Sequence, residues 1–288
     1  MRKLALPALI ASAFLAPAAA LAQTTAPAPA APAAAPAPTP EFTGNLTLAS
    51  DYRFRGISQT YKLPAVQGGF DYANPSGFYL GTWMSNVSGN QYSNGASLEW
   101  DMYGGYKGNI TNDLAFDLGG LYYYYPGARY NVPARTKYDN FELYGALTWK
   151  WFTLKYSHTL TDFFGTKNET FGGACEDART GTATNCIAAA PGNSKGSGYV
   201  DLTYTYEFAE KTNFIAHVGH QGVRHYSQLA YTDYKVGVTK DIGFFTFGAA
   251  VIGTNAKKGF YTVSEPGSPG NYKVVSNGTF VVTVGKTF

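Results

Sequence analysis

Charged residues are scarce in this chain of 288 residues: Asp, Glu, Lys and Arg together make up 14% of it, less than the 16% contributed by Phe, Trp and Tyr. Such a composition is not that of a disordered protein. Long apolar runs are also missing beyond the N-terminus, which excludes a bundle of membrane helices. Tyr, Phe, Gly, Thr and Asn are abundant instead, as is typical of strands and turns.

The N-terminus has the order of charge and apolar residues that marks a secretory signal. Arg2 and Lys3 precede an apolar stretch, which ends in the small-residue site Ala20-Leu21-Ala22. We therefore expect a signal peptide over residues 1–22; a retained membrane anchor is the alternative, disfavoured by two prolines in the run. Removal of the signal peptide leaves 20 basic and 19 acidic side chains, and this balance of charge gives no reason to expect nucleic acid as a partner.

Residues 23–40 consist almost entirely of Ala, Pro and Thr. Proline fixes φ and removes a backbone donor, so this stretch cannot build a packed core. We expect a semi-extended periplasmic linker, with binding to the cell wall as the alternative. Residues 41–288 then form the folded domain.

Cysteine is nearly absent. Cys175 and Cys186 lie in a stretch rich in Gly, Thr and Asn. In an exported protein such a pair predicts a disulfide that closes a loop. A metal site would need further ligands, and the segment contains no histidine, so we expect neither a metal nor a cofactor.

The folded part alternates apolar and polar residues with a period of two, which is typical of strands. In the stretch 45–55, for example, Tyr52 and Phe54 belong to the apolar face, and the other face carries Asp51, Arg53 and Arg55. About twelve such strands recur, most of them ten to thirteen residues long. Soluble strands have about five or six residues, whereas a tilted strand that crosses a bilayer needs about nine to eleven.

Short turns alternate with long loops along the chain. Outer-membrane barrels have short periplasmic turns and long external loops, with aromatic girdles at both membrane interfaces. Trp149 and Trp151 flank a short turn, and residues 122–125, all tyrosines, approach a long loop. The sequence therefore predicts an all-β fold, an antiparallel up-and-down transmembrane β-barrel, with periplasmic termini and with lipids and lipopolysaccharide around it. A soluble sandwich with an aromatic core is the alternative.

The last strand ends in Phe288 and has Phe280, Val282 and Val284 on the same parity. A C-terminal Phe that closes an alternating apolar strand resembles the signal by which the insertion machinery recognises outer-membrane barrels. Lys286 departs from this pattern, but at the membrane edge a long side chain can reach water.

Charge indicates which face of each strand meets lipid. A basic residue at the bilayer midplane costs about 2–4 kcal/mol, so the polar faces must line the lumen. Lys155 and His158 lie on one strand but have opposite parity, so they cannot both face the lumen. We place Lys155 inside and leave the orientation of His158 open. The residues expected to line the pore are Asp51, Arg53, Arg55, Asp71, Glu99, Asp101, Asp117, Glu142, Lys155, Asp201, Asp233 and Lys235. Acids outnumber bases there, which favours cations weakly, but mutual pairing of these charges is an equally good interpretation.

A barrel of about twelve strands is intermediate in width between small barrels, whose interior is filled by side chains, and porins with a wide aqueous channel. We therefore expect passive diffusion of small hydrophilic solutes or ions through a narrow lumen. The segment 165–198, which contains both cysteines, is the best candidate for an inward-folded constriction, with an ordinary exposed loop as the alternative. The cluster Asp51, Arg53 and Arg55 either shapes a constriction or fixes strand register.

Two other classes of function are alternatives to the channel. An outer-membrane hydrolase would need clustered catalytic groups, but His217 and His220 should face opposite sides of a strand, and no G-x-S-x-G elbow occurs. We expect no catalytic residues. The other alternative is a closed barrel whose external loops contact partners, and the long loops are equally compatible with it. The sequence leaves the oligomeric state open.

Three runs in the N-terminal third are distinctive: SDYRFRGISQT at 50–60, PAVQGGFDY at 64–72 and SGFYLGTW at 76–83. Together they resemble the TorF family of proteobacterial porins, for which no function is established. The resemblance continues more loosely through Glu99-Trp100-Asp101 toward the C-terminal Phe. It implies an outer-membrane barrel with channel activity but no substrate, and the linker and the cysteine-bearing loop look like additions to the family pattern.

Overall fold

The computed structural model describes residues 40–92, 96–176, 184–265 and 270–288. The predicted signal peptide and residues 23–39 of the predicted linker lie outside the described residues. In chain order the elements are β1 (Glu41–Ala49), β2 (Arg53–Phe54), β3 (Ile57–Ser58), β4 (Ala65–Ala73), β5 (Phe78–Asn86), β6 (Leu98–Asn109), β7 (Leu114–Tyr124), β8 (Asn140–Trp149), β9 (Phe152–Thr159), η1 (Phe163–Gly165), α2 (Asn168–Phe171), β10 (Gly198–Ala209), β11 (Thr212–Gly222), η3 (Ser227–Leu229), β12 (Tyr231–Ile242), β13 (Phe245–Thr254), η4 (Lys258–Tyr261), β14 (Thr262–Ser264), β15 (Tyr272–Val274) and β16 (Thr279–Thr287).

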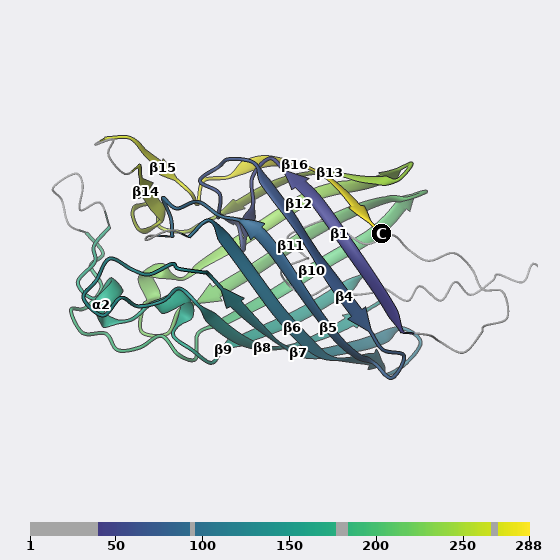
Figure 1. The fold of residues 1–288 in the computed structure, drawn as a ribbon, viewed down its shortest axis with the longest axis horizontal. Coiled ribbons are helices and arrows are strands. Elements are labelled where there is room, and N and C mark those ends of the chain that lie inside the picture. The colour runs from purple at the N-terminus through teal and green to yellow at the C-terminus, as the bar shows by residue number, and fades with distance from the viewer. Residues whose placement is uncertain (1–39, 93–95, 177–183, 266–269) are drawn as a thin grey trace, which may run out of the picture.

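Within these described residues, twelve strands form one closed antiparallel barrel (Figure 1). Each wall strand pairs with the next wall strand along the chain, and β1 closes the barrel against β16, with Leu48 opposite Val284. The remaining strands form two separate hairpins, β2–β3 and β14–β15. The predicted up-and-down barrel of about twelve strands is confirmed. No helix among the described residues is long and apolar enough to cross a membrane.

The two ends of the barrel differ in their connections. At one end, here called the short-turn end, at most four residues join consecutive wall strands, and both β1 and β16 have their terminal ends there. The opposite, long-loop end carries the connections 50–64, 87–97, 125–139, 160–197, 223–230 and 255–278. Figure 1 shows α2 and the β14–β15 hairpin projecting from this long-loop end.

The barrel is apolar outside and polar inside. On β12, Tyr234, Val236 and Val238 are exposed, and Val236 has an exposed fraction of 50%. Asp233 and Thr239, which alternate with them, are buried inside. An exposed apolar belt around a whole protein is unfavourable in water. In lipid it is stable, because a closed barrel pairs every strand. The fold is therefore a transmembrane barrel.

Aromatic side chains gather at both ends of the outer surface, but some of the residues expected in these girdles lie inside the barrel instead. Trp149 and Trp151 are exposed beside a short turn. Of the tyrosines 122–125, Tyr123 and Tyr125 are buried inside the barrel, so only the other two can belong to an outer girdle. The correction follows from the strand geometry, since successive side chains point to opposite faces.

A charge on the outward face of β12 should destabilise the protein strongly. Val236 lies near the middle of this strand, so Val236→Arg should lower the free energy of unfolding by about 2–4 kcal/mol. The measurement is urea unfolding of the refolded protein in lipid vesicles, with Val236→Leu as the control that should match the wild type. Equal unfolding midpoints for the Arg and Leu variants would show that this face does not meet hydrocarbon.

Candidate functional site

Residues 50–64 leave the wall and fold across the lumen. β1 ends at Ala49, whose partner Ala65 begins β4, so the chain departs and returns at paired positions. Between them, β2 and β3 form a hairpin whose two turn residues, Arg55 and Gly56, have φ of 45° and 79°. Positive φ at both positions is the type I′ geometry that suits the twist of paired strands. We call residues 50–64 the inward segment.

The prediction that the first strand continues beyond Ala49 is therefore wrong. Tyr52 does not face lipid: it is buried, donates its hydroxyl to Glu99 of β6 at 3.1 Å, and packs edge-on against Trp83. Phe54 packs against aromatic rings of β7 and η1 inside the lumen. Alternation marks one apolar and one polar side of the chain, and it cannot tell lipid from an aromatic cluster inside the barrel.

Asp51 and Arg53 hold the base of the hairpin. Arg53 Nε donates to Asp51 at 2.7 Å, and its Nη1 donates to the carbonyls of Val275 and Asn277 at 3.1 and 2.9 Å. Asp51 also accepts a hydrogen bond from the Ser58 hydroxyl at 2.6 Å. The inward segment is thus tied to the connection that precedes β16, on the same side of the barrel.

Arg55, at the tip, reaches the opposite wall. Its Nη2 donates to Glu142 of β8 and its Nη1 to Gln221 of β11, both at 2.6 Å, while its guanidinium lies 4.2 Å from the ring centre of Tyr199 on β10. Burial alone would lower the pKa of Arg55, but the Glu142 carboxylate outweighs burial and raises that pKa above its usual value. The ion pair links the tip of the inward segment to the opposite wall of the barrel.

A cluster of tyrosines fills the lumen beside this hairpin, toward the long-loop end. The ring of Tyr92 lies 4.6 Å from that of Tyr125 and 5.2 Å from that of Tyr138. Burial, together with the charge of Glu99, raises the pKa of Tyr92, so its hydroxyl keeps its proton and contacts Gln59 of the inward segment. This part of the lumen therefore combines fixed charges with packed aromatic rings.

The residues predicted to line the pore all face the interior. Asp51, Arg53 and Arg55 belong to the inward segment rather than to the wall. The nine others are on wall strands: Asp71 on β4, Glu99 and Asp101 on β6, Asp117 on β7, Glu142 on β8, Lys155 on β9, Asp201 on β10, and Asp233 and Lys235 on β12. Because the trio lies beyond the last wall residue of β1, it does not set the register of that strand.

A histidine that the sequence analysis did not assign to the lumen joins two of these acids. His217 of β11 contacts Asp201 through Nδ1 and Asp233 through Nε2, each at 2.8 Å. Carboxylates accept hydrogen bonds, so donation by both ring nitrogens requires the imidazolium. His217 points inward and His220 outward, in accordance with the expectation that they face opposite sides. Among the described residues no group of His, Cys, Asp and Glu is arranged to hold a metal ion.

A second group of polar side chains on the barrel wall has buried atoms without a hydrogen-bond partner in the described residues. Both carboxylate oxygens of Asp101, Oε2 of Glu99 and the indole nitrogen of Trp83 are buried without a hydrogen-bond partner in the described part of the chain. All three residues lie on β5 or β6, and Trp83 is opposite Asp101. Buried polar atoms are costly unless hydrogen-bonded, so this wall favours contact with water or a hydrophilic solute.

The sequence matches a family model, Gcw_chp, over residues 33–288; the family is described as a bacterial protein of unknown function. The chain belongs to the Gcw_chp family. The match supports this family name and does not support the name TorF. No curated protein sequence matches the chain.

Among solved structures, the barrel of this Gcw_chp protein is similar to several porins. A structure of KdgM porin has 7% sequence identity and a TM-score of 0.48, over 85% of this chain and 98% of that chain. NanC porin has 9% identity and a TM-score of 0.46, over 86% and 99% of the two chains. OprD from Pseudomonas aeruginosa has 14% identity and a TM-score of 0.35, over 86% and 66%.

The disulfide segment does not form the constriction in its described residues. Cys175 and Cys186 form a disulfide with a Cα–Cα distance of 4.0 Å. The surrounding chain lies at the long-loop end, where Ile187 packs against Tyr226 and Leu229 of the neighbouring connection. Phe171 and Ala174 of this segment pack in the same cluster, among the long-loop connections.

The residues of the predicted C-terminal signal lie on the outer surface. Phe280 and Val282 are exposed, as is Phe288; Val284 is half-buried. A side chain at Gly44 would meet the Phe288 ring at 2.5 Å, so glycine makes room for this ring against β1. Recognition by the insertion machinery stays a prediction.

Proposed function

We propose that this Gcw_chp protein is an outer-membrane porin through which small hydrophilic solutes or ions diffuse passively along a narrow lumen. The observation that carries the proposal is the inverted surface: an apolar exterior encloses a wall of charged residues. Eight strands already give an interior that is filled by side chains, so twelve strands enclose a wider interior, and here charged residues line it.

The orientation in the membrane follows from the two ends. Outer-membrane barrels keep short turns in the periplasm and long loops outside, so the termini are periplasmic and the inward segment enters from the cell exterior. The signal peptide expected at 1–22, the linker expected at 23–40 and the resemblance of residues 50–83 to the TorF family support the same location. The surrounding partners are outer-membrane lipids and lipopolysaccharide.

Planar-bilayer recording of the refolded protein tests the proposal. We expect discrete, small conductance steps and a reversal potential in a salt gradient that favours cations weakly, because the proposed pore-lining residues include more acids than bases. Protein that is folded and inserted, yet conducts nothing, would refute the channel.

A closed barrel that only presents its loops is the second candidate. It is favoured by the dense packing at the long-loop end, where Tyr52, Trp83 and Tyr123 are at most 2% exposed. The same recording separates the two functions, because a closed barrel gives no steps. We propose no enzymatic activity, and the same preparation should leave phospholipid and peptide substrates unhydrolysed.

A further inference from the structure

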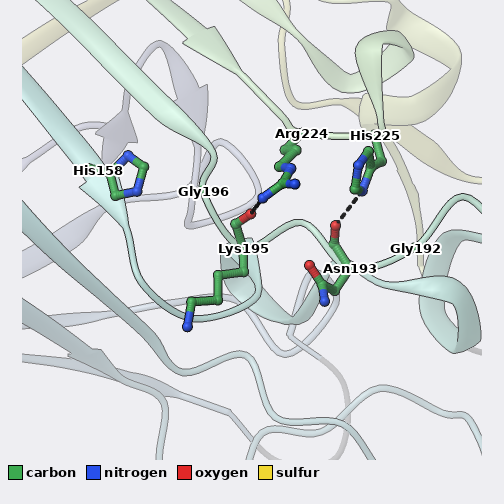
Figure 2. A pocket seen from close by; sticks show the side chains of 7 residues that line it. All are labelled: His158, Gly192, Asn193, Lys195, Gly196, Arg224 and His225. Atoms are coloured by element: carbon green, nitrogen blue, oxygen red, sulfur yellow. Dashed lines mark hydrogen bonds between the residues drawn. The ribbon is translucent and has the colours of Figure 1, made fainter.

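A cavity of about 670 Å³ lies beside the barrel at its long-loop end. Three segments line it (Figure 2): His158 near the end of β9, the loop 192–196 before β10, and Arg224 and His225 just after β11. His158 has the same parity as Leu154 and Tyr156, which are exposed on the outer face. The cavity is therefore on the outside of the wall, separate from the lumen.

The cavity is basic. His158, Lys195, Arg224 and His225 contribute to it, and none of the described residues that line it is acidic. The carboxylate of Asp162, which is close by in the same connection, accepts a hydrogen bond from the backbone of Ser194 at 3.1 Å. A concave surface with the two cations Lys195 and Arg224 and no carboxylate attracts an anion.

Hydrogen bonds to the loop hold two of the basic side chains, Arg224 and His225, in place. Arg224 Nη1 donates to the Lys195 carbonyl at 3.2 Å, and His225 Nδ1 donates to the Asn193 carbonyl at 2.8 Å (Figure 2). Gly196 has φ of 89°, and a side chain there would meet Arg224 Nη1 at 3.3 Å and His158 Cε1 at 3.9 Å. Glycine thus keeps open the point where these two side chains converge.

The height of the cavity matches the outer edge of the lipid. His158 is paired with Gly198 at the top of β10, and the outward residues of β10 extend from there down to Phe208 near a short turn. Ten residues of strand span about 33 Å. A tilt of about 40° reduces this to about 25 Å, the height of the apolar band of outer-membrane barrels. The cavity is then level with the headgroups of the outer leaflet.

We propose that this cavity binds a phosphate group of the phosphorylated glycolipid, lipid A, that forms the outer leaflet. The inference rests on the proposed function only for the orientation of the barrel in the outer membrane. A guanidinium matches a phosphate with paired hydrogen bonds, and a lysine adds a flexible point charge. Arg224 provides the first, Lys195 the second, and His158 borders the lipid side.

The test measures binding of lipid A to the refolded full chain in detergent micelles by native mass spectrometry. The probes are lipid A with its phosphates, the same lipid after their removal, and inorganic phosphate. We expect the phosphorylated lipid to bind about tenfold more tightly than the dephosphorylated one, and Lys195→Ala/Arg224→Ala to lose about tenfold in affinity. Arg224→Lys should fall between the double variant and the wild type.

Arg135→Ala/Lys258→Ala is the matched control, because it removes the same charge from two exposed residues in other long-loop connections. It should bind like the wild type. Equal affinity of both double variants, or of both forms of the lipid, would overturn the proposal. Inorganic phosphate that competes as well as the lipid would show a site for soluble anions instead. Conductance of the Lys195→Ala/Arg224→Ala variant should be unchanged, so failure of the lipid site is distinguishable from failure of the channel.

Discussion

Replacement of residues 50–64 by a four-residue turn should increase the single-channel conductance of this protein several-fold. The inward segment places Arg55 across the lumen, at 2.6 Å from groups on β8 and β11. It also packs Tyr52 against Trp83 and Phe54 against Tyr123. Its ends are already adjacent, since Ala49 is paired with Ala65, and a short Asn-Gly turn can join them without strain on the wall. Current through a pore is limited mainly by its narrowest part, so removal of a segment that crosses the lumen should have the largest effect.

The control for this experiment shortens another long-loop connection. β14 and β15 project from the same end of the barrel (Figure 1), and removal of residues 265–271, which connect them in the sequence, should leave conductance near the wild-type value. If both deletions leave conductance unchanged while the protein stays folded, the inward segment is not the constriction. If neither the wild type nor the shortened protein conducts, the barrel is closed by other residues.

The wall of the barrel could be predicted from the sequence because one rule governs it. Each wall strand has a lipid face and a lumen face, and only the period-two pattern and the cost of a buried charge are needed to assign them. For this reason Lys155 was placed correctly inside despite the conflicting parity of His158. In the proposed orientation His158 is level with the lipid headgroups, where both apolar and polar side chains are tolerated, so its parity carries no information.

The inward segment could not be predicted because its pattern is the same as that of a wall strand. Tyr52 and Phe54 alternate with charged residues, as they would in a strand facing lipid, and their partners Trp83 and Tyr123 are more than twenty residues away. One local signal was present: Arg55-Gly56 stands between two residue pairs that can form a tight hairpin. His217 likewise gained its role only through its register against Asp201 and Asp233 on two neighbouring strands.

Arg55→Ala should lower the free energy of unfolding by about 3 kcal/mol, toward the lower end of the range for breaking a buried ion pair. The side chains of Arg55 and Glu142 are 5% and 2% exposed, so the variant leaves an anion buried without its cation. Weaker neutral donors remain near this carboxylate, including the hydroxyl of Tyr123 at 3.3 Å, and they keep the loss from being larger. Urea unfolding followed by tryptophan fluorescence measures the change.

The double variant Arg55→Ala/Glu142→Gln distinguishes a lost contact from a stranded charge. If the penalty comes from the unpaired Glu142 carboxylate, its neutralisation should recover most of the stability, because replacing both members of a buried pair is far less costly than removing one. Asp113→Ala, which breaks the exposed pair with Lys150, is the control and should cost about 0–1 kcal/mol. A loss for Arg55→Ala no greater than this control would mean that the tip of the hairpin is not anchored to β8. The inward segment would then be free to move, and the conductance of the wild type should already approach that of the shortened protein.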